Sequence, residues 1–134
     1  MRALIVAVLA VVLLRVPALA GADFPKPLKE AATREELVNH FGTTIGFGKV
    51  EKWEFTTAGH QLISFWYCPY SGRAACYVHA YYYDREKRAW VLFIDRMLEP
   101  ATDLSAEISA DHFFIFKNRD GKVVVRESIE SLPK

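Results

Sequence analysis

Two cysteines, Cys68 and Cys76, restrict the fold of this chain more than any other feature of its sequence. They are the only cysteines. Cys68 ends the strand-like aromatic run 61–68, and Cys76 lies at the beginning of the next one, 75–83. A disulfide between directly opposed residues would fix an antiparallel register in which partners have residue numbers that sum to 144. Closing so short a loop contributes about 2.5 kcal/mol in the chain-entropy model. We therefore expect a disulfide, and because the spacing matches no zinc or redox motif, we expect no metal site.

The first 20 residues have the pattern of a cleavable signal peptide. Arg2 precedes an aliphatic run over residues 3–14, and the small residues 18–20 predict cleavage after Ala20. The alternative is an uncleaved anchor, but this run has 12 residues, whereas a membrane-spanning helix needs roughly 20. The sequence thus predicts export to a bacterial periplasm or the extracellular space, with no membrane span after cleavage. An oxidising compartment also favours the disulfide.

Charge and histidine spacing exclude several classes of function. The chain has 17 basic and 16 acidic residues, and loss of Arg2 and Arg15 with the signal leaves 15 against 16. A balance this even gives no attraction to nucleic acid or to anionic membranes. The histidines lie far apart in the sequence and lack the spacing of metal ligands: His40, His60, His79 and His112. We expect neither a metal nor a cofactor.

After the signal, the sequence predicts an extended lead-in over 21–32, with Pro25 and Pro27, and a single domain over 33–134. Thr33 and Glu36 have the spacing of a capping box, in which Thr33 caps the Glu36 amide and Glu36 returns to the Thr33 amide. The helix that begins there is expected to end near Phe41, because Gly42 follows. Its apolar face includes Leu37 and Val38.

From residue 49 onward, the hydrophobic pattern is that of strands separated by short turns. The predicted strands are 49–57, 61–68, 75–83, 89–98, 112–117 and 122–129. The stretch 99–111 is ambiguous between a helical turn around Leu104 and Ile108 and the beginning of the fifth strand. Short connections require antiparallel neighbours. The expected fold class is α+β: an N-terminal helix packed on a five- to six-stranded, mainly antiparallel meander that can be strongly curved.

The predicted registers divide the central strands into two faces, both apolar. The disulfide register pairs Trp66 with Val78, and a four-residue turn after Asp84 would place Asp95 opposite Val78, away from His79. One face then carries Leu62, Trp66, Val78, Ala80, Val91, Phe93 and Met97. The other, which we call the tyrosine face, carries Ile63, Phe65, Tyr67, Tyr77, His79, Tyr81, Tyr83, Trp90, Leu92 and Ile94. We expect the helix to cover the first face, because small residues make it shallow.

An uncovered tyrosine face would be suited to recognition, since tyrosine combines apolar area with a hydroxyl group that needs a partner. The expected binding residues are Tyr67, Tyr77, His79, Tyr81, Tyr83 and Trp90. The expected function is that of a small exported binding or accessory protein, monomeric or homodimeric, that recognises an unknown protein, peptide or glycan. One alternative is a small hydrolase or ligand carrier with His79 in a pocket. Another is a purely structural domain that buries this face as core; an enzyme is the less favoured class.

Overall fold

The computed structural model describes residues 26–57, 59–70, 75–99 and 103–133. These residues form one helix and ten strands arranged in three sheets. In chain order, the elements are β1 (Glu30–Ala31), α2 (Arg34–Phe41), β2 (Thr44–Ile45), β3 (Gly48–Lys49), β4 (Glu51–Thr57), β5 (His60–Tyr67), β6 (Cys76–Asp84), β7 (Ala89–Leu98), β8 (Ser105–Ile108), β9 (Phe113–Lys117) and β10 (Val123–Ser128). The predicted signal peptide and its cleavage site lie outside the described residues.

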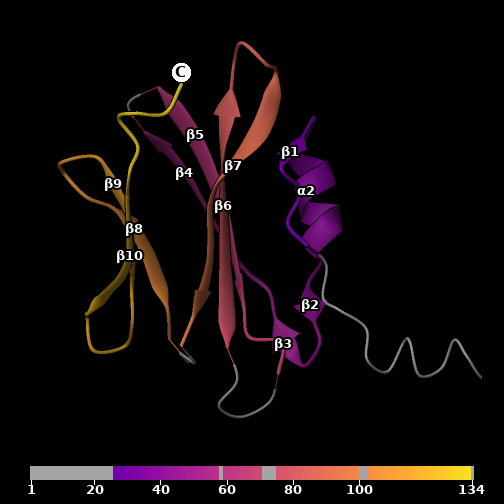
Figure 1. Ribbon diagram of the computed structural model, residues 1–134, viewed down its shortest axis with the longest axis vertical. Helices are drawn as coiled ribbons and strands as arrows, with labels where there is room; N and C mark the ends of the chain where they lie inside the picture. The colour runs from indigo at the N-terminus through magenta and orange to yellow at the C-terminus, as the bar shows by residue number, and fades with distance from the viewer. Residues whose placement is uncertain (1–25, 58, 71–74, 100–102, 134) are drawn as a thin grey trace, which may run out of the picture.

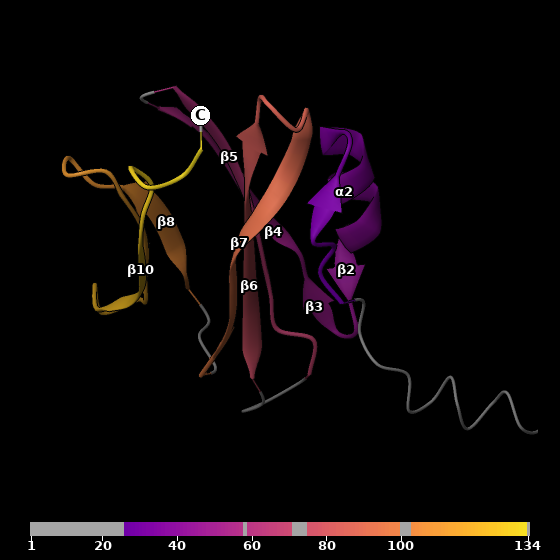
Figure 2. The same ribbon diagram turned by 45° about the horizontal axis from the view of Figure 1, so that its top comes forward.

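The molecule is built of three layers, with a five-stranded sheet in the middle (Figure 1). The order of its strands is β1-β7-β6-β5-β4, and all neighbours are antiparallel. A three-stranded sheet, β10-β9-β8, lies on one side, and α2 with the small β2-β3 hairpin lies on the other. Figure 2 shows the same layers after rotation.

Helix α2 begins where the capping signal predicts. Thr33 has extended backbone angles, and its hydroxyl oxygen accepts a hydrogen bond from the Glu36 amide at 3.1 Å. The return bond differs from the expected one, because the Glu36 carboxylate accepts from the amide of Ala32 rather than from that of Thr33. At the other end, Gly42 adopts a φ of 68°, a backbone conformation that favours glycine.

The disulfide and the register that it implies are both confirmed. Cys68 is bonded to Cys76, with 4.2 Å between the α-carbons, a separation typical of directly opposed residues. Strands β5 and β6 pair Trp66 with Val78 and Tyr67 with Tyr77, so partner numbers sum to 144 along the whole ladder. The cysteine pair therefore continues the ladder by one position.

The register between β6 and β7 follows the prediction only as far as Leu92. Tyr82 lies opposite Val91, as expected, but a β-bulge then places Ala80 opposite Ile94 and His79 opposite Asp95. The predicted pairing of Asp95 with Val78 is wrong, because the bulge inserts one extra residue, Phe93, into β7. Since strand side chains alternate between faces, one inserted residue moves every later side chain of β7 to the other face. Asp95 and Met97 consequently lie on the tyrosine face.

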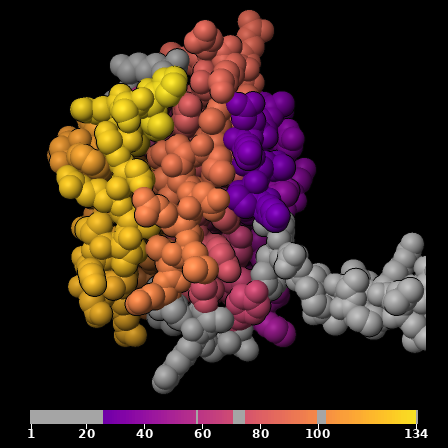
Figure 3. All heavy atoms as spheres, in the orientation of Figure 1, coloured from indigo at the N-terminus to yellow at the C-terminus, as the bar shows by residue number. Residues whose placement is uncertain are grey.

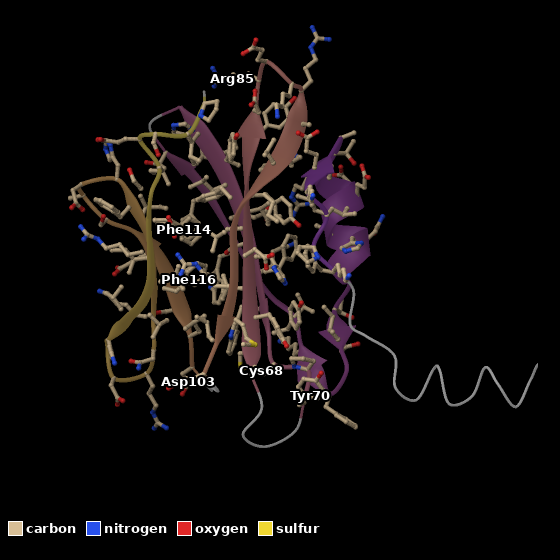
Figure 4. The ribbon with its side chains drawn as sticks, viewed as in Figure 1. Cys68, Tyr70, Arg85, Asp103, Phe114 and Phe116 are labelled. Carbon is tan, nitrogen blue, oxygen red and sulfur yellow. A yellow bond between two sulfur atoms is a disulfide. The ribbon has the colours of Figure 1, made fainter. Side chains whose placement is uncertain are left out.

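The second sheet covers the face that the sequence analysis assigned to the helix. Phe114 and Phe116 of β9 are fully buried and point into the space between the two sheets (Figure 4). Phe114 contacts Phe55 and Phe93, and Phe116 contacts Trp53, with ring centroids 5.4 to 6.2 Å apart. Leu62, Val78 and Ala80 belong to the same buried cluster. This interface is the larger of the two cores.

The helix packs on the tyrosine face instead, so its predicted position is wrong. The Phe41 ring stacks on Phe65 at 4.3 Å and on His79 at 5.4 Å between centroids. Leu37, Ile63 and other residues of this face complete the second core. At the outer side of the sheet, the Arg34 guanidinium of α2 forms an ion pair with Glu54 of β4.

The predicted fold class must also be corrected. The described chain is mostly β, with one helix of eight residues and strands distributed among three sheets, not an α+β domain with one five- to six-stranded meander. Part of the difference lies in the ambiguous stretch, where residues 105–108 form β8 and pair with β9. The last two predicted strands then belong to this separate sheet, which folds over the central one. The end of the predicted lead-in is a short edge strand, β1, paired with β7.

Candidate functional site

The predicted binding residues are gathered on one face, and most of them are buried. Tyr67, His79, Tyr81 and Trp90 are buried, while Tyr77 and Tyr83 are half-buried. The hydroxyl group of Tyr81 donates to the carbonyl oxygen of Leu28 at 2.8 Å, which ties the segment before β1 to the sheet. Helix α2 and the segment 28–31 thus cover most of the tyrosine face. The most exposed side chains on this face, those of Asp95 and Met97, lie at its margin toward the disulfide.

At that margin, three side chains from three adjacent strands are linked by polar contacts. The oxygen of the Tyr67 hydroxyl group lies 2.8 Å from Nε2 of His79. Nδ1 of the same ring lies 3.0 Å from a carboxylate oxygen of Asp95, which is off the axis along which a ring N–H would donate. The Asp95 charge nonetheless favours the proton on Nδ1, so Nε2 accepts from Tyr67. Tyr67 and His79 are nearly inaccessible, whereas the Asp95 side chain is 55% exposed.

Burial keeps Tyr67 and His79 neutral near pH 7. Burial raises the pKa of Tyr67 to about 12, and electrostatic interactions with the nearby Tyr77 and Asp95 add to the effect. Burial lowers the pKa of His79, and this exceeds the opposing effect of the Asp95 carboxylate. Asp95 is therefore a negative charge beside a neutral imidazole ring, with its other side open to solvent.

This set of groups has the composition of a base-activated hydroxyl, but not the access that catalysis requires. A nucleophile needs a base within hydrogen-bond reach and also a substrate within reach. Here the Tyr67 hydroxyl group is buried, and the Phe41 ring stacks against the His79 ring. The contacts therefore connect β5, β6 and β7 under the helix, and only the carboxylate of Asp95 faces outward.

Sequence reasoning missed Asp95 as a site residue because it placed Asp95 on the opposite face. The signal that could have located it is the bulge, yet Phe93 and Ile94 are both ordinary strand residues, and nothing in the sequence marks an extra residue there. The exposed Met97 is on the tyrosine face for the same reason, since it lies opposite Tyr77.

Large apolar side chains are exposed at the disulfide end of the molecule. Phe47 is 87% exposed, Met97 69% and Tyr70 47%. The amide of Phe47 donates to the carbonyl oxygen of Pro69 at 2.8 Å, so the tip of the β2-β3 hairpin lies against the segment that follows β5. Figure 4 shows Tyr70 and Cys68 at this same end. We call Phe47, Tyr70, Tyr77, Asp95 and Met97 the disulfide-end surface.

Close packing keeps this surface in place. A Cβ atom at Gly48 would lie 2.7 Å from the carbonyl carbon of Cys68, so the β2-β3 hairpin approaches the backbone of the disulfide-bonded residue directly. The ring of Tyr77 stacks on that of the buried Tyr67, with 5.6 Å between their centroids. The exposed side chains are therefore carried by a backbone that is fixed by a disulfide, a hairpin and stacked rings.

The described residues contain neither a cluster of metal ligands nor a membrane-spanning helix. Nowhere in 26–57, 59–70, 75–99 or 103–133 do three or more histidine, cysteine or acidic side chains come together in a way that would hold a metal. In the same ranges, no helix has the length and apolar character needed to cross a bilayer. Comparisons with protein-family models, with curated proteins and with solved structures found no match to this chain.

Proposed function

We propose that this chain is a small exported binding protein that recognises its partner through the disulfide-end surface. The observation that supports this most is the position of Phe47, Tyr70 and Met97, three large apolar side chains exposed at one end of the domain. Recognition surfaces of proteins are enriched in aromatic residues and methionine. The tyrosine face takes part in this proposal only at its accessible margin, through Tyr77 and its neighbours on β7.

The scaffold is of the kind that binding requires. A disulfide between adjacent strands reduces the conformational entropy lost when a partner binds, because the surface is already ordered. The disulfide also fits an oxidising compartment, in agreement with the predicted signal peptide. An apolar surface on a rigid backbone can gain affinity from burial without paying for rearrangement.

Affinity capture tests this proposal. The exported, oxidised protein is immobilised and incubated with envelope and secreted proteins of the producing organism, and bound proteins are identified by mass spectrometry. We expect a reproducible partner for the wild type and at least tenfold less of it for Met97→Asp and for Phe47→Ser. Each change replaces an exposed apolar side chain with a polar one and leaves the core unaltered.

Val124→Asp is the matched control. Val124 is an exposed apolar residue of β10, on the second sheet, and is not part of the disulfide-end surface. This variant should retain the partner. Equal capture by Met97→Asp and the wild type, or no specific partner at all, would count against the proposal and would favour the purely structural alternative. A hydrolase that uses His79 is disfavoured by the burial of that ring and of the Tyr67 hydroxyl group.

A further inference from the structure

Strand β7 has an outer edge, and the described part of the chain pairs with only the first part of it. Strand β1 pairs with Trp90 and Val91, and the amide of Leu92 donates to the carbonyl oxygen of Lys29. From Phe93 to Leu98, the described residues provide a ladder partner only on the β6 side. Figure 3 looks onto this edge, where the orange atoms of β7 lie at the surface between the yellow second sheet and the indigo N-terminal layer. An edge of this kind presents main-chain donors and acceptors to a partner.

Residues 26–29, the described part of the chain before β1, do not continue along this edge. The Leu28 carbonyl oxygen accepts from Tyr81, and the Lys26 carbonyl oxygen lies 2.6 Å from Nε2 of His40 on the helix. Pro27, between them, has no amide to donate. The segment therefore turns toward α2, and the open part of the β7 edge begins where it leaves.

Two charged residues in the middle of the open edge differ in how they are compensated. Arg96 projects toward the second sheet, where its guanidinium forms an ion pair with Glu127 at 2.7 Å. Asp95 projects to the helix side. There its neighbour within the described chain is the neutral ring of His79, which does not compensate its charge. The edge thus presents a single uncompensated negative charge, with the exposed, apolar Met97 two residues further along the same face.

Pairing of this edge with a second copy of the chain is opposed by its charges. Such a dimer has a twofold axis perpendicular to the sheet, so the helix-covered faces of the two sheets lie on the same side. Residues that oppose each other across the two β7 strands must then come from the same face of β7. The two centred registers set Asp95 against Asp95 or Arg96 against Arg96, and the next one sets Asp95 against Glu99. Like charges directly opposed across strands are destabilising. The open edge therefore selects against its own copy.

We propose that residues 93–98 of β7 bind an extended segment of another protein as an additional antiparallel strand, with a basic residue opposite Asp95 and an apolar residue opposite Met97. The antiparallel direction continues that of β1 on the same edge. This inference rests on the proposed binding function and specifies its partner: main-chain hydrogen bonds supply affinity, and the side chains on the helix side supply specificity.

Model peptides test this mode of binding. The probe is a nine-residue peptide, acetylated and amidated, in which threonine and valine alternate apart from one central lysine, and a valine lies two residues before that lysine. Added to the ¹⁵N-labelled, oxidised protein, it should shift the amide resonances of Ile94 to Leu98 and leave those of the opposite edge, β4, unchanged. A glutamate in place of the lysine should weaken binding about threefold or more.

Two N-methylated versions of the lysine peptide are matched to each other. In each, every second amide is methylated, so one version loses the amides that face β7 and the other loses those that face solvent. The version that lacks the amides facing β7 should lose binding, and the version that lacks the amides facing solvent should keep it. Binding by both, or shifts confined to β4, would overturn the proposal.

Asp95→Lys should reverse the preference, so that the glutamate peptide binds better than the lysine peptide. Asp103→Lys, which reverses an exposed carboxylate elsewhere, should leave the preference unchanged. The captured partner provides the last test. If Met97→Asp abolishes its capture but neither Asp95→Lys nor excess lysine peptide weakens it, the strand-pairing proposal fails while the binding function stands; failure to capture any partner refutes the binding function itself.

Discussion

At the level of single residues, the surroundings of His79 make the domain sensitive to mild acid. Its ring contacts Tyr67 of β5 and Asp95 of β7, the charge of His40 on the helix also acts on it, and burial is the largest influence on its pKa. Because the pKa is lower in the folded protein than the value of about 6.5 in an unfolded chain, the unfolded state binds more protons below that pH. This contribution to stability is complete above about pH 6.5 and is lost as the pH falls toward the folded pKa.

We therefore expect the free energy of unfolding to decrease between pH 7.5 and pH 5, with a slope of at most about 1.4 kcal/mol per pH unit from this one group. Urea denaturation at a series of pH values measures it. His79→Gln cannot take up a proton here, so its stability should change less over the same range. The pKa values of Glu54 and Asp111 are also lowered, by hydrogen bonds from Arg34 and Ser109 respectively, but these carboxylates titrate below this range. If the free energy of unfolding of His79→Gln fell as steeply with decreasing pH as that of the wild type, another group would be responsible.

Residue-level signals in the sequence were reliable where their physics is local. Thr33 predicts the start of the helix because its hydroxyl group needs only an amide three residues away. The disulfide predicts its own register for the same reason. The role of Asp95 was not predictable, because it depends on a bulge at Phe93, whose ring packs against Phe114, a residue of the second sheet that is distant in the sequence.

At the level of elements, the β2-β3 hairpin depends on a glycine that is required for close approach. At Gly48, an added methyl group would overlap the backbone of Cys68, which the disulfide holds in place. Gly121 is the matched comparison: its φ of 80° disfavours other residues, but a methyl group there meets no atom within 4 Å. Gly121→Ala should therefore cost about 1 kcal/mol. Gly48→Ala should cost more, about 2 to 3 kcal/mol, because backbone must move.

Urea denaturation of the two variants gives this comparison directly. Backbone amide resonances add a local readout, since displacement of the hairpin should shift Phe47, whose amide donates to Pro69. If Gly48→Ala were no more destabilising than Gly121→Ala, the hairpin would not be packed against the disulfide strand. In that case the disulfide-end surface would lack the rigidity that we assign to it.

The strands themselves were largely predictable, and their partners in space were not. Residues 89–98 form β7 as predicted, because a run of apolar and aromatic residues between turns describes a strand whatever covers it. Which layer covers which face is a different question. Both faces are apolar, so the pattern does not say whether the helix packs on Val78 and Ala80 or on Phe65 and Tyr81. The packing of Phe41 decides it, and that is a tertiary contact between residues distant in the sequence.

At the level of the whole molecule, a central sheet that is apolar on both sides requires two covering layers. The sequence predicts that both faces are apolar, but it also led us to expect the last strands in the same sheet. They instead form a separate sheet, because residues 105–108 pair with β9 and supply the third strand that makes it a layer. We consequently propose binding only at the margin of the tyrosine face, which neither covering layer reaches, and not for the whole face.

Because both layers pack against one sheet, we expect the domain to unfold in a single cooperative transition. Phe41→Leu weakens the helix layer and Phe116→Leu weakens the second sheet, and each should lower the free energy of unfolding by about 1 to 1.5 kcal/mol. The two residues lie on opposite faces and share no ring contact among those described, so their effects should add to within about 0.5 kcal/mol in the double variant.

Urea denaturation followed by far-ultraviolet and near-ultraviolet circular dichroism tests this expectation. The two signals should give coincident curves for both single variants and for the double variant. Curves that separate in Phe41→Leu alone would mean that the helix detaches before the sheets unfold. The tyrosine face beneath it would then become accessible, and recognition by that whole face would again have a structural basis.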